Sequence, residues 1–350
     1  MLHAVAALWL AAAPGRAPAP GAWRTNGPAY PLVEAIALVP GQETVVYAAA
    51  RDTESSTSGL FRSDDGGLSW TLLAQAPFQA SVRRLAIDPT GTQRMLALTT
   101  SGGREYVYRS EDGGASWVQT RLFVSDQRAT VFFDPVAADT AYLFGGGELK
   151  RSEAGGAWEE IGGGYSAWVS PEGALFLAEA IQTPCGLIFL CYGDKVFVSR
   201  TQGRTFDPLG TGTCLDPDSI VYAPSDPSVA YGTAAICLPL VKSTDGGALW
   251  KPVEVGELAG ILGSKGRVAG IAVDPLDPAS IFLAVVFSDD PNGGLLLRSG
   301  DGGERWTRVP VPEPPTGPIA IGPSDRVLYL GTVQGVFRRP LGRTQTLPAR

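Results

Sequence analysis

Residues 63–70 read SDDGGLSW, and the same order of serine, aspartate, two glycines and tryptophan returns three times along the chain. The further intact copies of this box are residues 110–117 (SEDGGASW), 243–250 (STDGGALW) and 299–306 (SGDGGERW). Two degenerate copies, residues 152–158 (SEAGGAW) and 199–206 (SRTQGRTF), lie between them. A unit that recurs in this way indicates a chain built from one repeated structural module.

The spacing between the aromatic residues that end the boxes gives the length of the module. Successive aromatics are separated by 47, 41, 48, 44 and 56 residues, which is the usual length of a β-propeller blade. Each box follows a short predicted strand such as residues 59–62 (GLFR), and an Asp-Pro phrase such as Asp88-Pro89 lies upstream. Four short strands separated by turn residues account for one unit.

Counting the units predicts a closed ring. Six complete units end near residues 73, 120, 161, 209, 253 and 309. A seventh begins at residues 318–323 and runs to residues 335–338 without a box, while Trp23 stands 47 residues before Trp70. We therefore expect residues 21–340 to form an all-β, seven-bladed β-propeller of four-stranded antiparallel blades. The N-terminal strand pairs into the last blade, because closure removes the open edges.

Composition agrees with this architecture and excludes several functions. The 350 residues include 44 Gly and 28 Pro, which break helices and build turns. The net charge is −7, from 28 basic and 35 acidic residues, so the chain lacks the basic balance that binds nucleic acid through its phosphates. His3 is the single histidine, which argues against a histidine base or a histidine-rich metal site.

The box residues have a structural interpretation and a functional one. Paired glycines supply positive φ angles, the aspartate and serine can hydrogen-bond to the turn, and the tryptophan can pack between blades. Catalysis or calcium binding by the aspartates is the alternative. We favour the structural role because the boxes repeat around the rim, away from any common centre. The residues concerned are Asp65, Trp70, Asp112, Trp117, Trp158, Asp245, Trp250, Asp301 and Trp306.

The pattern S-x-D-G-G-x-x-W, coupled to I-x-x-D-P, resembles the Asp-box (bacterial neuraminidase) repeat propellers. These include sialidases, xyloglucan-hydrolysing glycosidases, the sortilin receptor domain and photosystem II assembly factors. The repeat covers nearly all of the chain after residue 21. The resemblance implies the propeller fold, but one propeller supports many unrelated activities.

The resemblance also implies where a site lies. In such propellers the links before each first strand lie at the mouth of the central channel, on the face opposite the boxes. Arginines there could hold the carboxylates of an anionic glycan or an acidic peptide. The alternative is a set of solvated loop charges too far apart to act together. The candidate ligand-binding residues are Glu34, Arg83, Arg84, Arg128, Asp218 and Arg267.

An enzymatic role is the second interpretation of this mouth. Similarity to sialidases implies three arginines, a Tyr–Glu nucleophile pair and an early Arg-Ile-Pro motif, and blade one lacks that motif. Xyloglucan-cleaving relatives use two propellers, whereas this chain has the length of one. We therefore predict a non-catalytic binding platform for a protein or glycan, with a sialidase-like glycoside hydrolase as the alternative. No cofactor is predicted. Residues 288–294 carry oxygen ligands, as a calcium loop would, but they lack the full spacing and the closing Glu of an EF-hand, so we favour a plain turn.

The N-terminus and the cysteines favour an oxidising compartment. Residues 2–13 are apolar except for His3, which suits the core of a signal peptide and is too short to span a bilayer. Residues 1–20 are thus a signal peptide or a disordered Ala/Pro-rich tail, and residues 341–350 form a C-terminal tail. We expect a secreted protein or one in the cell envelope or periplasm. The cysteines suit two disulfides, Cys185–Cys191 and Cys214–Cys237, although four buried thiols are an alternative.

Overall fold

The computed structural model describes residues 22–55, 57–74, 81–124, 129–184, 190–213, 220–234, 238–253, 256–290 and 293–342. The predicted N-terminal segment of residues 1–20 lies outside this set, as do residues 343–350. Within the described ranges, no helix is long and apolar enough to cross a membrane.

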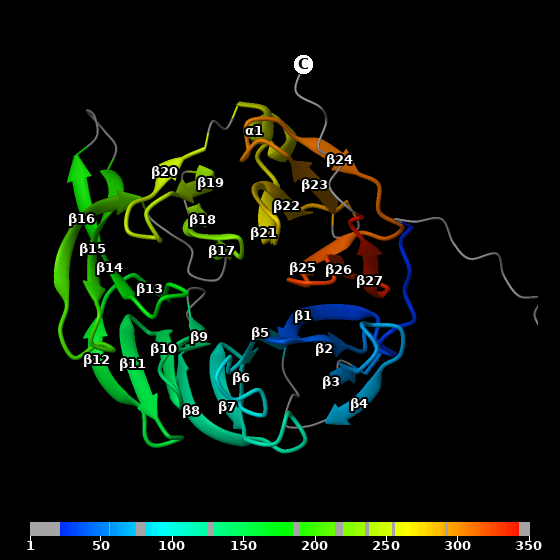
Figure 1. The fold of residues 1–350 in the computed structure, drawn as a ribbon, viewed down its shortest axis with the longest axis horizontal. Helices are drawn as coiled ribbons and strands as arrows, with labels where there is room; N and C mark the ends of the chain where they lie inside the picture. Colours follow the sequence, from blue (N-terminus) through cyan, green and yellow to red (C-terminus); the bar gives the residue numbers. More distant parts are fainter. Residues whose placement is uncertain are drawn as a thin grey trace, which may run out of the picture.

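The described strands form seven antiparallel sheets arranged around a central axis (Figure 1). Six sheets have four strands in sequential order, and the seventh has three strands plus a bridge to the N-terminal segment. The first strands of blades 5, 6, 7, 1, 2 and 3 contact one another in turn around the axis. The predicted all-β, seven-bladed propeller is therefore confirmed.

The first four blades follow the predicted repeats. Blade 1 contains β1 (Leu32–Val39), β2 (Gln42–Arg51), β3 (Ser58–Ser63) and β4 (Thr71–Ala74). Blade 2 contains β5 (Ser81–Ile87), β6 (Met95–Ser101), β7 (Arg104–Ser110) and β8 (Val118–Val124). Blade 3 contains β9 (Thr130–Phe133), β10 (Thr140–Gly145), β11 (Glu148–Glu153) and β12 (Glu159–Gly163). Blade 4 contains β13 (Ser166–Val169), β14 (Leu175–Pro184), β15 (Leu190–Ser199) and β16 (Asp207–Thr213).

The last three blades complete the ring. Blade 5 contains β17 (Val221–Ala223), β18 (Asp226–Ala234), β19 (Leu238–Ser243) and β20 (Lys251–Pro252). Blade 6 contains β21 (Gly266–Asp274), β22 (Asp277–Phe287), β23 (Leu295–Ser299) and β24 (Thr307–Val309). Blade 7 contains β25 (Pro315–Ile321), β26 (Val327–Thr332) and β27 (Gly335–Pro340).

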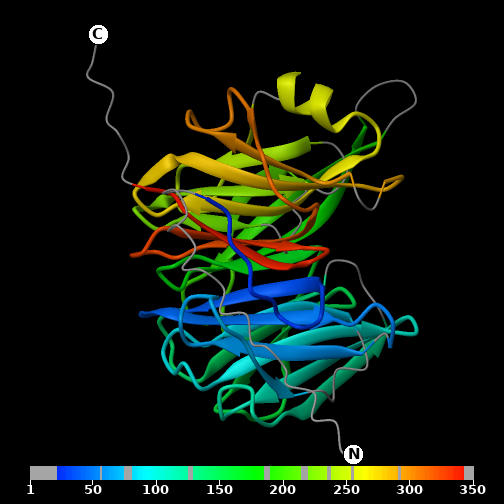
Figure 2. The same ribbon diagram turned by 90° about the vertical axis from the view of Figure 1, so that its right-hand side faces the viewer.

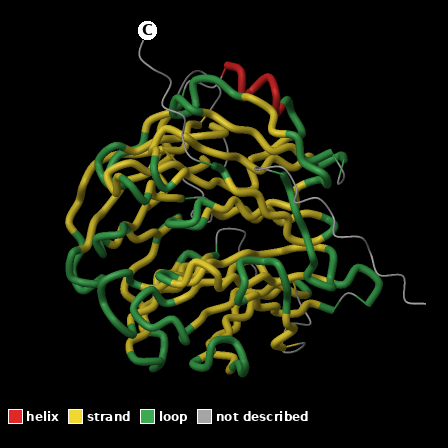
Figure 3. Tube along the Cα trace, turned by 45° about the vertical axis from the view of Figure 1, so that its right-hand side comes forward, coloured by secondary structure: helices red, strands yellow, loops and turns green. Residues whose placement is uncertain are grey.

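A short helix between blades 5 and 6 was not predicted. Helix α1 (Gly256–Leu262) lies at the outer edge of the ring, where Figure 3 draws it in red. Leu258 and Leu262, four residues apart, share one helix face and are buried in the core cluster of these two blades. Glu257 accepts a hydrogen bond from the Trp306 amide at 3.1 Å, so the helix is tied to the start of β24.

The N-terminal segment closes the ring as predicted. Arg24 and Arg338 of β27 exchange backbone hydrogen bonds of 3.0 and 2.8 Å, and Figure 2 shows the blue N-terminal segment beside the red last blade. Trp23 packs against a core cluster of blades 6 and 7 that includes Phe282 and Leu330, and its Nε1 donates to the Pro310 carbonyl at 2.8 Å. Trp23 therefore takes the place in blade 7 that the box tryptophan has in other blades.

The box aromatics pack each blade against the one before it. Trp250 of blade 5 lies in a cluster with Phe176 of blade 4, and Trp306 of blade 6 lies with Tyr231 of blade 5. The two tryptophans are only 5% and 6% exposed. Each ring removes a large apolar surface from water between two sheets, so these contacts hold consecutive blades together.

Side chains of the box hold its turn. Ser63 Oγ accepts a hydrogen bond from the Gly67 amide at 2.7 Å. Asp65 accepts hydrogen bonds from the Ser69 amide and hydroxyl at 2.8 and 2.6 Å. The first glycine has a φ of 70°, a conformation that glycine adopts at little cost, and its amide donates to the Thr44 carbonyl. The box therefore lies beside the turn between the first two strands of its own blade.

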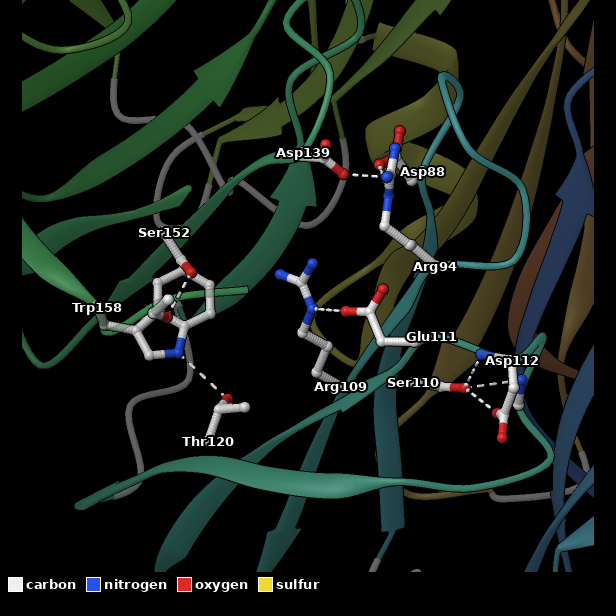
Figure 4. Close-up of polar contacts among 12 residues, drawn as sticks. Asp88, Arg94, Arg109, Ser110, Glu111, Asp112, Thr120, Asp139, Ser152 and Trp158 are labelled. Carbon is white, nitrogen blue, oxygen red and sulfur yellow. Dashed lines mark hydrogen bonds and ion pairs between the residues drawn. The ribbon is translucent and has the colours of Figure 1, made fainter. Parts of the chain in front are cut away.

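The Asp-Pro phrase supplies a second turn contact on the same face. Asp88 is buried and accepts hydrogen bonds from the Thr90 amide at 2.8 Å and from Arg94 Nε at 2.7 Å. Arg94 also pairs with Asp139 of blade 3, so this arginine links two blades (Figure 4). Asp134, the corresponding residue of blade 3, is likewise buried and accepts hydrogen bonds from its own turn.

Candidate functional site

A cavity of about 950 Å³ occupies the centre of the ring. The first strands of blades 1, 2, 5, 6 and 7 enclose it, and these strands surround the axis in Figure 1. Its volume lies within the range of about 300–1,000 Å³ that is typical of ligand pockets. The deeper wall is apolar and includes Leu38, Ile87 and Ile319.

Four of the six predicted ligand-binding residues line this cavity. Glu34, Arg83, Arg84 and Arg267 all lie within the first four residues of β1, β5 or β21. Ser58, at the start of β3, donates to Glu34 at 3.2 Å, so third strands begin at this end of the channel. The boxes follow the ends of the third strands. The structure thus gathers these four residues at the channel mouth opposite the boxes.

Glu34 links blade 1 to blade 2. One carboxylate oxygen lies 3.1 Å from Arg51 Nε, and the other accepts hydrogen bonds from Ser58 Oγ and, at 2.9 Å, from the Val82 amide. The Glu34 side chain is only 9% exposed. Both oxygens are thus engaged in holding the inner strands, which suits a positioning role better than proton transfer.

Arg83 is neutralised by a residue that the sequence analysis missed. Its Nη1 lies 2.5 Å from Oε1 of Glu105, whose side chain is wholly buried. Removing either partner of such a pair leaves a buried charge uncompensated. The signal was present in the sequence, because alternation along β7 places Glu105 with Val107 on the buried face of the strand.

Arg84 and Arg267 complete the charged lining of the cavity. Arg84 is half-buried, and Arg267 is exposed. Among the described residues, no carboxylate lies within ion-pair distance of Arg267. The charged side chains that line the cavity are Glu34, Arg83, Arg84 and Arg267. The cavity wall therefore carries more positive than negative charge, on a chain whose net charge is −7.

The remaining predicted residues lie outside the described part of the chain, or their side chains do. Arg128 and Asp218 are outside the described residues, as are Cys185, Cys214 and Cys237. Cys191 belongs to β15, but its side chain is not described. The disulfides and the two further mouth residues therefore stay predictions. Within the described part of the chain, no group of three or more His, Cys, Asp or Glu side chains could hold a metal ion.

The pKa shifts of the box aspartates have a local cause. The Ser69 hydroxyl, together with other hydrogen bonds of the turn, lowers the pKa of Asp65 to about 2. The Ser116 hydroxyl likewise lowers the pKa of Asp112. Hydrogen bonds to the ionised form explain these shifts, and each carboxylate serves its own turn. The geometry therefore fits the predicted turn role for these aspartates.

Comparison with known proteins supports the fold and leaves the activity open. No protein-family model matches the chain. Over 78 residues the chain is 40% identical to xyloglucanase Xgh74A of Acetivibrio thermocellus, covering 19% of this chain and 9% of that protein. The match therefore spans less than a tenth of that curated relative.

Two solved structures share the architecture. The GH74 xyloglucanase from Xanthomonas campestris superposes with a TM-score of 0.62 and 18% identity, over 95% of this chain and 55% of that chain. A structure described as YCF48 bound to D1 peptide superposes with a TM-score of 0.58 and 14% identity, over 93% and 99% of the two chains. The chain is thus a seven-bladed β-propeller that resembles the propellers of GH74 xyloglucanases.

Proposed function

We propose that the protein is a non-catalytic binding platform whose channel mouth holds a ligand rich in carboxylates, such as an acidic peptide. Arg84 and Arg267 supply the contacts, because guanidinium groups bind carboxylates through paired donors. Glu34 and the Arg83–Glu105 pair hold the inner strands on which these arginines stand. The ring is rigid because its two chain ends are joined in one blade.

The observation that carries this proposal is the charge of the mouth. Cationic side chains line an open cavity, while the described carboxylates beside them are already engaged within the protein. No aromatic side chain is among the described residues that line the cavity, so a sugar ring has no flat surface there on which to stack. An extended acidic chain therefore suits the mouth better than a neutral glycan. The structure described as YCF48 bound to D1 peptide is a propeller of similar fold that binds a peptide, which supports a peptide ligand here.

Binding of a fluorescein-labelled, glutamate-rich peptide to the full chain tests the proposal, with its glutamine counterpart as the control ligand. We expect the glutamate peptide alone to bind and its affinity to fall with added salt. Arg267→Ala should weaken binding about tenfold, the scale of one lost charged contact. Arg305→Ala, an exposed arginine in the box of blade 6, should not change it. Equal binding of both peptides, or equal losses in both variants, would overturn the proposal.

The proposal includes export from the cytoplasm. It rests on the apolar residues 2–13 and on the cysteine content. Fractionation of expressing cells, with the mass of the mature chain, tests it. Retention of the full-length chain in the cytoplasm with four free thiols would contradict this part alone.

A glycoside hydrolase is the second candidate, and the local identity to a xyloglucanase favours it. Such enzymes need two carboxyl groups about 5–5.5 Å or about 6.5–9.5 Å apart. In the described cavity wall the carboxylate is Glu34, whose oxygens are engaged. Asp218 is the remaining candidate acid. Turnover of xyloglucan or of a fluorogenic sialoside that disappears with Asp218→Asn would replace the binding platform with an enzyme.

A further inference from the structure

A cation recurs at the end of the third strand in six blades. It stands immediately before the box serine, or at the corresponding position of blade 7. These residues are Arg62, Arg109, Arg151, Lys242, Arg298 and Arg338. In each blade the residue lies directly opposite a large side chain of the second strand, as Arg62 lies opposite Tyr47.

This cation fills the space between its own blade and the next box. Lys242 lies 5.4 Å from the centre of the Tyr231 ring, and Arg62 lies 5.7 Å from that of Tyr47. Arg151 Nη1 donates to the Gln202 carbonyl in the box of blade 4 at 2.8 Å. A Cβ atom added to Gly302, the first glycine in the box of blade 6, would lie 3.2 Å from Lys242 Nζ.

Blade 4 lacks the cation and has a pocket in its place. Val198 stands at the repeat position, directly opposite Phe176. Its side chain has no cationic group, and a pocket of about 260 Å³ opens between Phe176, Val198 and the box of blade 5. No atom lies within 4 Å of a Cβ added to Gly246, the glycine that corresponds to Gly302. The pocket thus occupies the position where other blades hold a cationic head group.

The rim of the pocket carries unbalanced negative charge. Glu172, Asp245 and Arg200 line it, and all three are exposed. Asp245 Oδ1 accepts hydrogen bonds from its own turn at 2.7 and 2.9 Å. Among the described residues no hydrogen bond reaches Oδ2, because Leu249 replaces the serine whose hydroxyl binds this oxygen in blades 1 and 2. A carboxylate oxygen therefore remains free at the rim.

We propose that this pocket between blades 4 and 5 binds an arginine side chain presented by a partner protein. The guanidinium group would lie over Phe176, as the chain's own cations lie over their rings, and would pair with Asp245 or Glu172. A planar guanidinium suits both contacts better than a compact ammonium group. The volume is below that of drug-sized ligand sites, about 300 Å³ and above, and fits a single side chain. The site lies on the box face and does not depend on a ligand at the channel mouth.

The direct test is titration of the full chain with N-acetyl-arginine methylamide, followed by NMR of backbone amides. The neutral citrulline analogue is the control ligand. We expect saturable shifts at residues 172–176 and 245–249 with the arginine compound only. Glu172→Gln should weaken binding several-fold, and Arg200→Gln should strengthen it, because a competing cation is removed.

Val198→Arg provides the sharpest variant, since it restores the side chain that the repeat lacks. We expect it to fill the pocket, abolish binding of the arginine compound and raise the thermal midpoint of the protein. Binding that persists in folded Val198→Arg would overturn the proposal, as would equal binding of the citrulline analogue. If Val198→Arg does not fold, unchanged binding in both Glu172→Gln and Asp245→Asn overturns it instead. Arg267→Ala should leave this binding intact, which separates the outcome from that at the channel mouth.

Discussion

The boxes of blades 6 and 3 both connect the third strand of their blade to the fourth, but different residues stabilise the two turns. In blade 6, Asp301 accepts hydrogen bonds from two amides of the turn at 3.0 Å each, and Trp306 Nε1 donates to the Gly303 carbonyl at 2.9 Å. The box of blade 3 is one residue shorter and has no aspartate. Its Ala154 takes the place of the first glycine, with a φ of 49° and an amide that donates to the Asp139 carbonyl.

The tryptophan remains in blade 3 although the aspartate is gone. Trp158 Nε1 donates to Thr120 Oγ1 of blade 2 at 3.1 Å rather than to its own turn (Figure 4). Ser152 now donates to the Gly156 carbonyl at 2.7 Å. Packing between blades therefore matters most to the ring, while the aspartate is a local support that the boxes of blades 3 and 4 both lack.

Loss of a box tryptophan should have the largest effect. Trp306→Ala should lower the free energy of unfolding by about 3–5 kcal/mol, as for other large core truncations. Trp158→Ala should lower the free energy of unfolding by only about 1–2 kcal/mol, because part of the Trp158 ring is already exposed to water in the folded protein. Denaturant unfolding measures both, and Leu276→Ala, at an exposed site, is the control. Equal losses at Trp306 and Trp158 would contradict the comparison.

Loss of a box aspartate should have a smaller effect. Asp112→Ala removes the acceptor for the Ser116 amide and hydroxyl and should cost about 1–2 kcal/mol. Thr201 stands at this position in blade 4 and accepts the Thr205 amide at 3.0 Å. Thr201→Ala should cost less than about 1 kcal/mol, since the contacts that its hydroxyl makes with Thr205 and Ser199 join neutral groups. A larger loss at Thr201 than at Asp112 would contradict the ranking.

The intact boxes should also make the stability of the folded protein fall at acid pH. Hydrogen bonding lowers the pKa of Asp65 to about 2 from an ordinary value of 3.8. The folded state binds this proton less readily than the unfolded state, so the contribution is complete above pH 3.8 and is lost as the pH falls toward 2. Thermal midpoints from pH 5 to pH 2 measure this loss. Asp65→Asn should show a shallower decline, and an unchanged slope would contradict the assignment.

Repair of a degenerate box should give the smallest change. Ala154→Gly relieves a left-handed alanine but makes the unfolded chain more flexible, so we expect a gain of about 0.5–1 kcal/mol. Gln202→Gly in blade 4, where φ is 56°, should behave alike. Chemical unfolding of both variants measures the gain. If both variants were less stable than the original protein, these turns would depend on the side chains of Ala154 and Gln202 rather than on backbone conformation.

The periodic part of the structure could be predicted from the sequence, and the site only in part. Blade number and closure follow from spacing, which is why Trp23 could be placed 47 residues before Trp70. The Glu34–Val82 contact depends on the distance between blades, which spacing does not reveal. Helix α1 was missed because seven residues with no regular repeat resemble a loop. The pocket beside Val198 could have been found by aligning the residue before each box serine.

The central claim is that the box face holds the ring together while the opposite mouth receives the ligand. Amide hydrogen exchange of the full chain, with and without the glutamate-rich peptide, tests it most directly. We predict slower exchange on binding near residues 32–34, 81–84 and 266–268, and no change at residues 110–117 and 299–306. Protection confined to the boxes, with none at the starts of β1, β5 and β21, would contradict the claim.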